Sequence, residues 1–182
     1  MATSAWADFG TAVFVVGRAS VVDQSGQTRA LVRGTHVQAG DLIRTAVGTR
    51  LQLRFADGAF ISMFPDSELG IDAYRYGGGA AGRETAFFTL YRGGARFLTG
   101  TIGRSAGSRF RTTTPLASLD VETGEFVAIA GKGLQLSVGR GGVSLHNERG
   151  ALRVQAGQRA FVADRTTAPY LVGTAIPYRI AP

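Results

Sequence analysis

The stretch LQLRFADGAFISMF, residues 51–64, decides the fold class of this chain. Leu51, Leu53 and Phe55 alternate with polar residues, as in a β-strand that buries one face. Asp57-Gly58 then separates this run from a second apolar run, and that dipeptide is the strongest short-range signal for a β-hairpin. The stretch therefore predicts two antiparallel strands joined by a tight turn.

The same alternation recurs in the C-terminal half, in the runs LQLSV (134–138), VSLH (143–146) and LRVQ (152–155). Asn147–Gly150 separates the last two runs as a hairpin loop, and Ser25-Gly26 marks another hairpin near the N-terminus. No window of comparable length places apolar residues at helical spacing. The pattern predicts an all-β chain with little or no helix.

The tetrapeptide VQAG occurs twice, at 37–40 and at 154–157, each time after a strand, a turn and a second strand. Such a repeat indicates hairpins stacked on one another. A content of 26 glycines and only 5 prolines is typical of many short strands joined by glycine turns. We expect a β-roll or a sandwich-like arrangement of stacked hairpins.

The length of 182 residues and the hydrophobic content of 45% are those of one domain with a proper core. The most loop-like stretch is YGGGAAGRE, residues 76–84, which divides the chain into two sections. We expect one β domain at residues 10–172, with two lobes at about 10–75 and about 85–172 that are joined by that exposed loop. Residues 1–9 and 173–182 would flank this domain.

Residues 1–9 read as a leader remnant or a flexible N-terminus, since Ala5-Trp6-Ala7 has the small-x-small form of a signal-peptidase site. The longest apolar run near the start, residues 12–16, is far shorter than the roughly 20 residues of a membrane-spanning helix. We therefore expect no transmembrane segment. The absence of cysteine excludes disulfides and thiolate metal sites.

The formal net charge is +7, and nearly all basic residues are arginines. One cluster of arginines is interleaved with two phenylalanines, Phe97 and Phe110, and consists of Arg92, Arg96, Arg104, Arg109 and Arg111. This cluster either grips an acidic partner, such as an anionic glycan or an acidic protein, or consists of solvated side chains on an outer face. No nucleic acid is expected as a partner, because no recognition fold is visible.

Motifs that suggest catalysis lack the structural context that their chemistry requires. Gly103–Gly107 has the G-x-S-x-G form around Ser105, and Asp120 and His146 follow in the order of a hydrolase triad. A nucleophile elbow needs a helix after the serine, whereas the residues that follow read as a strand. We expect a serine in a turn between two strands.

Two glycine patterns and the few possible metal ligands also lack the context that a nucleotide or metal site requires. Gly77, Gly79 and Gly82 match a dinucleotide-binding pattern, and Gly131-Lys132-Gly133 part of a phosphate loop, but both stretches read as turns. Two histidines, His36 and His146, are too few for a metal site, and Asp41 and Asp57 fit turns. The sequence predicts no enzyme, no cofactor and no metal.

Together these segments resemble the FecR domain family. Residues 34–72 contain a G-x-x-V-x-x-G-D-x-I-x-T turn that ends at Thr45, the Asp57-Gly58 hairpin, and a P-x-S-x-L-x-I continuation with Pro65 and Ser67. Later blocks are similar to the family's second motif and its last hairpins: 90–104, 110–117 and 137–162. The resemblance covers about residues 10–170.

One position departs from the family pattern. Where the family carries a short arginine-glycine-threonine turn, this chain has Glu122-Thr123-Gly124, with glutamate in place of the arginine. The substitution puts in doubt any function tied to that turn and leaves the fold untouched.

The resemblance implies a periplasmic, non-enzymatic module. In the branch that gives the family its name, the domain relays a signal from an outer-membrane transporter to a sigma factor through a membrane helix and a cytoplasmic segment. We expect this chain to lack both parts, because it resembles the free-standing branch. We therefore expect a periplasmic or secreted module that binds another envelope protein, as a scaffold or in signalling.

Two alternatives remain open. A β-rich chain can polymerise by strand addition, with the segment AVFVV (12–16) or the C-terminal tail as the donor strand. The arginine cluster could instead bind an anionic glycan.

Overall fold

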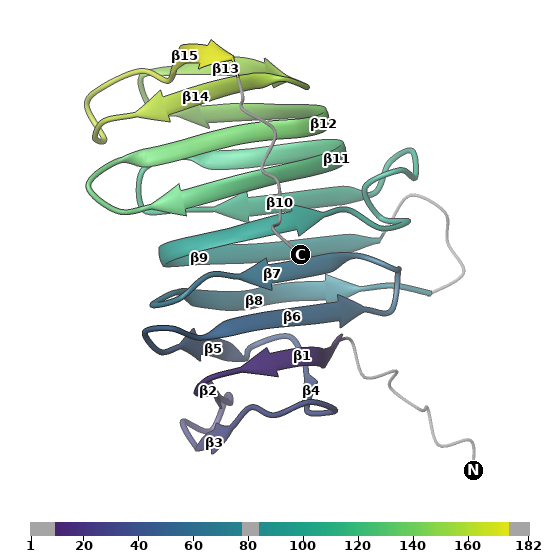
Figure 1. Ribbon diagram of the computed structural model, residues 1–182. Helices are drawn as coiled ribbons and strands as arrows, with labels where there is room; N and C mark the ends of the chain where they lie inside the picture. The colour runs from purple at the N-terminus through teal and green to yellow at the C-terminus, as the bar shows by residue number, and fades with distance from the viewer. Residues whose placement is uncertain (1–9, 78–83, 175–182) are drawn as a thin grey trace.

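The computed structural model describes residues 10–77 and 84–174. The regular secondary structure in these ranges consists of β-strands alone. Figure 1 shows the strands stacked nearly in sequence order, from β1–β4 at one end to β13–β15 at the other. The strands are β1 (Gly10–Val16), β2 (Ala19–Val22), β3 (Thr28–Ala30), β4 (His36–Val37), β5 (Leu42–Thr45), β6 (Arg50–Phe55), β7 (Phe60–Met63), β8 (Glu68–Arg75), β9 (Thr85–Leu98), β10 (Arg109–Thr113), β11 (Ser118–Ala130), β12 (Leu134–Asn147), β13 (Gly150–Gln155), β14 (Gln158–Val162) and β15 (Tyr170–Thr174).

The hydrogen-bond registers arrange these strands in two layers. The first layer has the order β3-β2-β5-β8-β9-β10-β11-β12-β13. The second has the order β4-β1-β6-β7-β9-β11-β12-β14-β15. The strands β9, β11 and β12 belong to both layers, so the sheet is one continuous surface that folds over itself. The predicted all-β fold of stacked hairpins is confirmed.

Glycines mark the points where the long strands pass from one layer to the other. Gly124 in β11 has a φ of 141° and Gly141 in β12 a φ of 74°, and these two residues face each other in the register. A Cβ at Gly141 would collide with the Thr123 carbonyl, and a Cβ at Gly124 with the Arg140 carbonyl. The segment Glu122-Thr123-Gly124 is expected to form a turn. It forms instead an irregularity inside β11.

The core lies between the two layers and is built from phenylalanines of both. Phe88 and Phe110 come from the first layer, and their ring centroids lie 5.5 Å apart. Phe97 and Phe126 come from the second layer and stack at 4.8 Å. Edge-to-face contacts join the layers, for example at 6.4 Å between Phe97 and Phe110. Burial of each ring contributes about 2–3 kcal/mol, so these contacts fix how the layers sit on each other.

The hairpin predicted at residues 51–64 is present as β6 and β7, which pair from Leu51–Met63 to Arg54–Phe60. The proposed donor segment 12–16 lies inside β1, which pairs along its length with β6 and at its start with β4. It is therefore part of the folded core structure, and the idea that it is free to be donated is wrong. No helix within residues 10–77 and 84–174 has the length and hydropathy of a membrane span.

The stretch 76–84 lies in the sequence between β8 and β9, two strands that pair with each other from Glu68–Arg92 to Arg75–Thr85. Gly79 and Gly82 of the dinucleotide-like pattern lie outside the described residues, as do residues 1–9 and 175–182. The last strand, β15, runs to Thr174, two residues beyond the predicted end of the domain.

Candidate functional site

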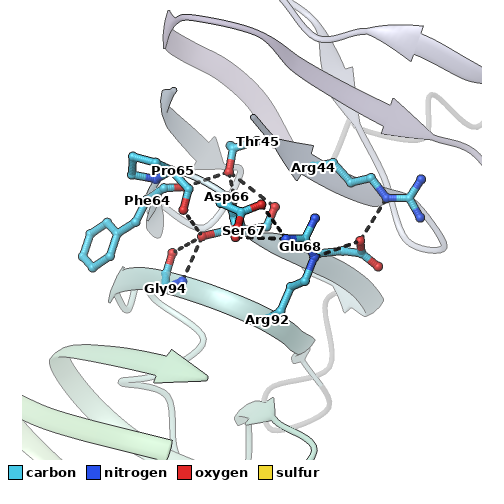
Figure 2. Close-up of polar contacts among 9 residues, drawn as sticks. All are labelled: Arg44, Thr45, Phe64, Pro65, Asp66, Ser67, Glu68, Arg92 and Gly94. Carbon is cyan, nitrogen blue, oxygen red and sulfur yellow. Dashed lines mark hydrogen bonds and ion pairs between the residues drawn. The ribbon is translucent and has the colours of Figure 1, made fainter. Parts of the chain in front are cut away.

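The residues of the sequence motif around Pro65 build a buried joint between the layers (Figure 2). Thr45 Oγ1 donates to the Phe64 carbonyl at 2.7 Å and accepts from Ser67 N at 2.9 Å. The Ser67 hydroxyl accepts from Gly94 N at 2.8 Å and lies 3.1 Å from the Gly94 carbonyl. Thr45 and Ser67 are almost completely buried, so this motif holds the architecture together and offers no surface to a ligand.

Arg92 lies on the exposed side of the same joint. Its guanidinium contacts Asp66 at 2.5 Å and Glu68 at 3.8 Å, and Glu68 also accepts from Arg44 at 3.0 Å. Figure 2 shows the four side chains as one ladder of alternating charge. The hydrogen bond to Asp66 raises the pKa of Arg92. The ladder neutralises Arg92 and connects β5, β8 and the bend of β9.

Arg96 points outward from the second layer, since its neighbours Ala95 and Phe97 are buried between the layers. It donates to Glu125 at 2.9 Å, and Arg140 reaches the other oxygen of the same carboxylate at 3.1 Å. The hydrogen bond from Arg96 is the largest of the effects that hold the pKa of Glu125 below its ordinary value. Arg96 is thus paired and lies on the opposite face from β10.

The other three predicted arginines come together on the outer face of the first layer. Arg104 belongs to the loop after β9, while Arg109 and Arg111 lie on the outward face of β10 and alternate with the buried Phe110 and Thr112. They line an open hollow of about 720 Å³, which we call the arginine hollow. Its wall consists of Gly103, Arg104, Ser105, Ala106, Gly107, Ser108, Arg109, Phe110, Arg111, Asp120, Val121, Glu122, Thr123 and Ser144.

The charges in the arginine hollow are only partly balanced. Arg111 pairs with Asp120 at 2.6 Å, and Glu122 pairs with Arg153 through two contacts of 2.7 and 2.6 Å. The hydrogen bonds from Arg153 lower the pKa of Glu122. Arg104 and Arg109 have no acidic partner among residues 10–77 and 84–174. Two positive charges therefore remain uncompensated on this wall.

One further arginine belongs to this region and escapes sequence reasoning. Thr85 of β9 pairs with Arg75 of β8 on one side and with Arg109 of β10 on the other, the latter in parallel register. Arg75 is exposed, and its side chain has no hydrogen-bond or ion-pair partner in the part of the chain that the structure describes. Only the strand order reveals this neighbour, because 34 positions separate Arg75 from Arg109 in the sequence.

A buried aspartate anchors the loop that carries Arg104. Asp57, only 4% exposed, accepts from the Tyr74 hydroxyl at 2.8 Å and from Ile102 N at 3.2 Å, and its carbonyl accepts from Thr101 N at 2.9 Å. Burial, together with the nearby Asp57 charge, raises the pKa of Tyr74, so the hydroxyl remains a donor. The turn role predicted for Asp57 is present too, since Oδ1 accepts from Ala59 N at 3.1 Å.

The hydrolase-like residues divide between two places. Ser105 lies in a turn, as predicted, and its hydroxyl donates to the Thr101 carbonyl at 3.0 Å. Asp120 does approach His146, with 3.6 Å between Oδ2 and Nδ1. His146, however, lines a separate hollow with Thr114–Ser118, whereas Ser105 lines the arginine hollow. Among the described residues, Ser105 makes no hydrogen bond to a base, so the set does not form a nucleophile–base pair.

The remaining sequence candidates have structural roles. Asp41 is buried and accepts from Gln38 N at 2.9 Å, and burial raises its pKa. His36 lies 3.2 Å from the Thr11 hydroxyl. Gly131-Lys132-Gly133 forms the turn between β11 and β12. The described residues contain no group of three or more histidine, aspartate or glutamate side chains that could hold a metal ion.

Comparisons with known proteins agree with this architecture. The family model described as FecR protein matches residues 41–144, which run from the start of the Asp41 turn into β12. Two crystal structures of a candidate anti-sigma factor from Parabacteroides distasonis, at 2.50 and 1.65 Å resolution, superpose with a TM-score of 0.59. Their sequence is 18% identical, and the superposition covers 73% of this chain and 59% of that one, which shows a shared fold. No curated protein matches the sequence.

Proposed function

Because the chain belongs to the FecR protein family, we propose that it is a non-catalytic, protein-binding module of bacterial envelope signalling, located in the periplasm or outside the cell. The observation that carries this proposal is the presence of two uncompensated positive charges in the arginine hollow. Within the arginine hollow, Arg111, Asp120 and Glu122 form ion pairs between strands, whereas Arg104 and Arg109 are left unpaired. The fold that it shares with a candidate anti-sigma factor supports a role in signalling.

The binding domain comprises residues 10–172, with 1–9 and 173–182 as flanking segments. A non-catalytic role is supported by the environment of Ser105, which has a carbonyl as its partner where a nucleophile needs a base. Esterase assays of the purified protein should give the same background rate for the wild type and for Ser105→Ala. An activity that the substitution abolishes would contradict this part of the proposal.

The partner of the module is another envelope protein. In the organism that encodes the chain, we expect crosslinking of the tagged protein to capture one envelope protein, and excess untagged chain to compete with it. Deletion of the gene should then change transcription of a defined set of genes. Capture that is not saturable, together with an unchanged transcriptome, would exclude a signalling role.

Two other functions rest on specific features. The arginine hollow would also accept phosphate or carboxylate groups of an anionic glycan, in which case lipopolysaccharide vesicles would retain the protein and a salt of moderate strength would release it. Self-assembly into a filament would use the exposed edge strands of the sheet.

A further inference from the structure

The arginine hollow has the chemical features of a docking site for a carboxylate. Arg109 is held over the ring of Phe87, with its guanidinium carbon 5.5 Å from the ring centroid, and Arg111 lies at 5.9 Å from the same ring. Stacking on an aromatic ring reduces the rotamer freedom of an arginine and leaves its N–H edge free to bind. Arg109 is thus already oriented before a ligand arrives.

The loop beside Arg109 adds further donors. Arg104 is exposed at its turn, and in the described structure the N–H groups of Ala106 and Gly107 donate to no other residue. The turn itself is fixed by hydrogen bonds from Arg104 N and Ser105 N to the Thr101 carbonyl, both at 3.0 Å. Two guanidinium groups and free backbone donors around one hollow match the acceptors of a carboxylate side chain.

We propose that the arginine hollow docks an acidic peptide segment of the partner protein, with Arg104 and Arg109 as the main contacts and Arg75 as an outer contact. This inference rests on the proposed protein-binding function. Strands in a sheet lie about 4.8 Å apart, so the backbone of Arg75 lies roughly 10 Å from that of Arg109. A segment with acidic residues at alternate positions would reach both arginines.

The rim of the hollow favours a peptide over a polyanion. Asp120 and Glu122 line the same wall as the arginines, and both keep their own arginine partners. A glycan with closely spaced phosphates would bring negative charge against both carboxylates, which is unfavourable. A peptide in which neutral residues separate the acidic ones avoids that repulsion.

The test uses the full chain and a defined probe. A fluorescently labelled peptide of about twelve residues with alternating glutamates is compared, by anisotropy at low salt, with the same peptide carrying glutamines. We expect binding of the glutamate peptide alone. The double substitution Arg104→Gln and Arg109→Gln should weaken it at least about tenfold, because charge-assisted contacts to two arginines are lost.

A matched control separates site binding from net charge. Arg50→Gln with Arg54→Gln removes the same charge from two exposed arginines of β6, which the described structure leaves without side-chain partners. We expect less than a twofold change for this variant. Equal loss in both double variants, or equal binding of the two peptides, would overturn the inference. Retention on lipopolysaccharide vesicles that depends on Arg104 and Arg109, without binding of the glutamate peptide, would overturn it in favour of a glycan.

Failure of the docking site and failure of the proposed function would give different experimental results. If the Arg104→Gln, Arg109→Gln variant still captures the envelope partner as well as the wild type does, the docking site is wrong and the binding role stands. If the glutamate peptide binds at these arginines and no partner is captured, the docking site stands and the signalling role is wrong.

Discussion

At the scale of single residues, the hydroxyl of Tyr74 holds Asp57, the residue that anchors the loop of the arginine hollow. It donates to Asp57 Oδ1 at 2.8 Å and accepts from Asp57 N at 3.0 Å in a buried environment. Tyr74→Phe removes both bonds, leaves the buried Asp57 N without a partner and leaves Asp57 Oδ1 with Ala59 N alone, so we expect a loss of about 2 kcal/mol in the free energy of unfolding. Urea denaturation of the purified protein measures it.

Tyr76 supplies the control for this prediction. It lies two residues further along the chain, and its hydroxyl makes no hydrogen bond within the described residues. Tyr76→Phe should therefore change the free energy of unfolding by less than about 0.5 kcal/mol. Equal effects of the two substitutions would show that the Tyr74–Asp57 contact is not what stabilises this region.

The carboxylate of Glu125 should make stability depend on pH. Hydrogen bonds from Arg96 and Arg140 hold its pKa below the ordinary 4.5, so the ion pair stabilises the folded state fully above that value. As the pH falls through the lowered pKa of the folded state, the carboxylate is protonated and this contribution disappears. Glu125→Gln should destabilise the protein by about 1 kcal/mol at pH 7 and by progressively less below pH ~4.

Chemical denaturation at several pH values, with Glu148→Gln as the comparison, tests this dependence. Glu148 is exposed in the turn between β12 and β13 and has no acidic or basic partner among the described residues. Its substitution should leave stability unchanged at every pH. A Glu125→Gln effect of constant size from pH 7 to pH 3 would contradict an electrostatic origin.

At the scale of the elements, the bends in β11 and β12 determine whether one strand can serve both layers. Gly141 has a left-handed φ of 74°, and a Cβ there would collide with the Thr123 carbonyl. Gly141→Ala should lower the free energy of unfolding by about 3 kcal/mol, the sum of backbone strain and displaced backbone. In Gly139→Ala, two residues away, the added Cβ would meet its neighbours at an ordinary 3.6 Å.

Thermal unfolding distinguishes the two alanine variants. For a chain of this length, 1 kcal/mol corresponds to roughly 2–4 °C, so Gly141→Ala should lower Tm by about 6–12 °C and Gly139→Ala by less than about 2 °C. Similar Tm values for both variants would mean that the bend tolerates a side chain, and that the glycine is not required for the passage between layers.

Alternation and turn residues were enough to predict the hairpins, because each depends on neighbours in sequence. The bend at Glu122-Thr123-Gly124 reads as a turn in the sequence, since a glycine that ends a strand and a glycine that bends one have the same local pattern. The parallel pairing of β9 with β10 has no local signature at all. For that reason the sequence grouped Arg92 and Arg96 with Arg109 and could not find Arg75.

At the scale of the whole molecule, the two ends of the stack differ as templates for another chain. The N-terminal end exposes the edges of β3 and β4, which have only three and two residues. The C-terminal end exposes the edges of β13 and β15, which have six and five residues. Among the described strands, β13 pairs with β12 alone and β15 with β14 alone. At the N-terminal end, the part of β1 that β4 leaves unpaired follows an irregularity between Ala12 and Phe14, so the longer regular edges for strand addition lie at the C-terminal end.

This asymmetry argues against a filament. Head-to-tail growth needs complementary edges at both ends, whereas pairing of two C-terminal edges closes into a dimer. We expect sedimentation velocity to show no species larger than a dimer at any concentration. Tyr170 and Leu171 of β15 are each 45% exposed, and Leu171→Lys, which charges that edge, should leave only monomer. Val47→Lys, at an exposed turn far from β15, should not alter association, and fibres in any of the three preparations would contradict the argument.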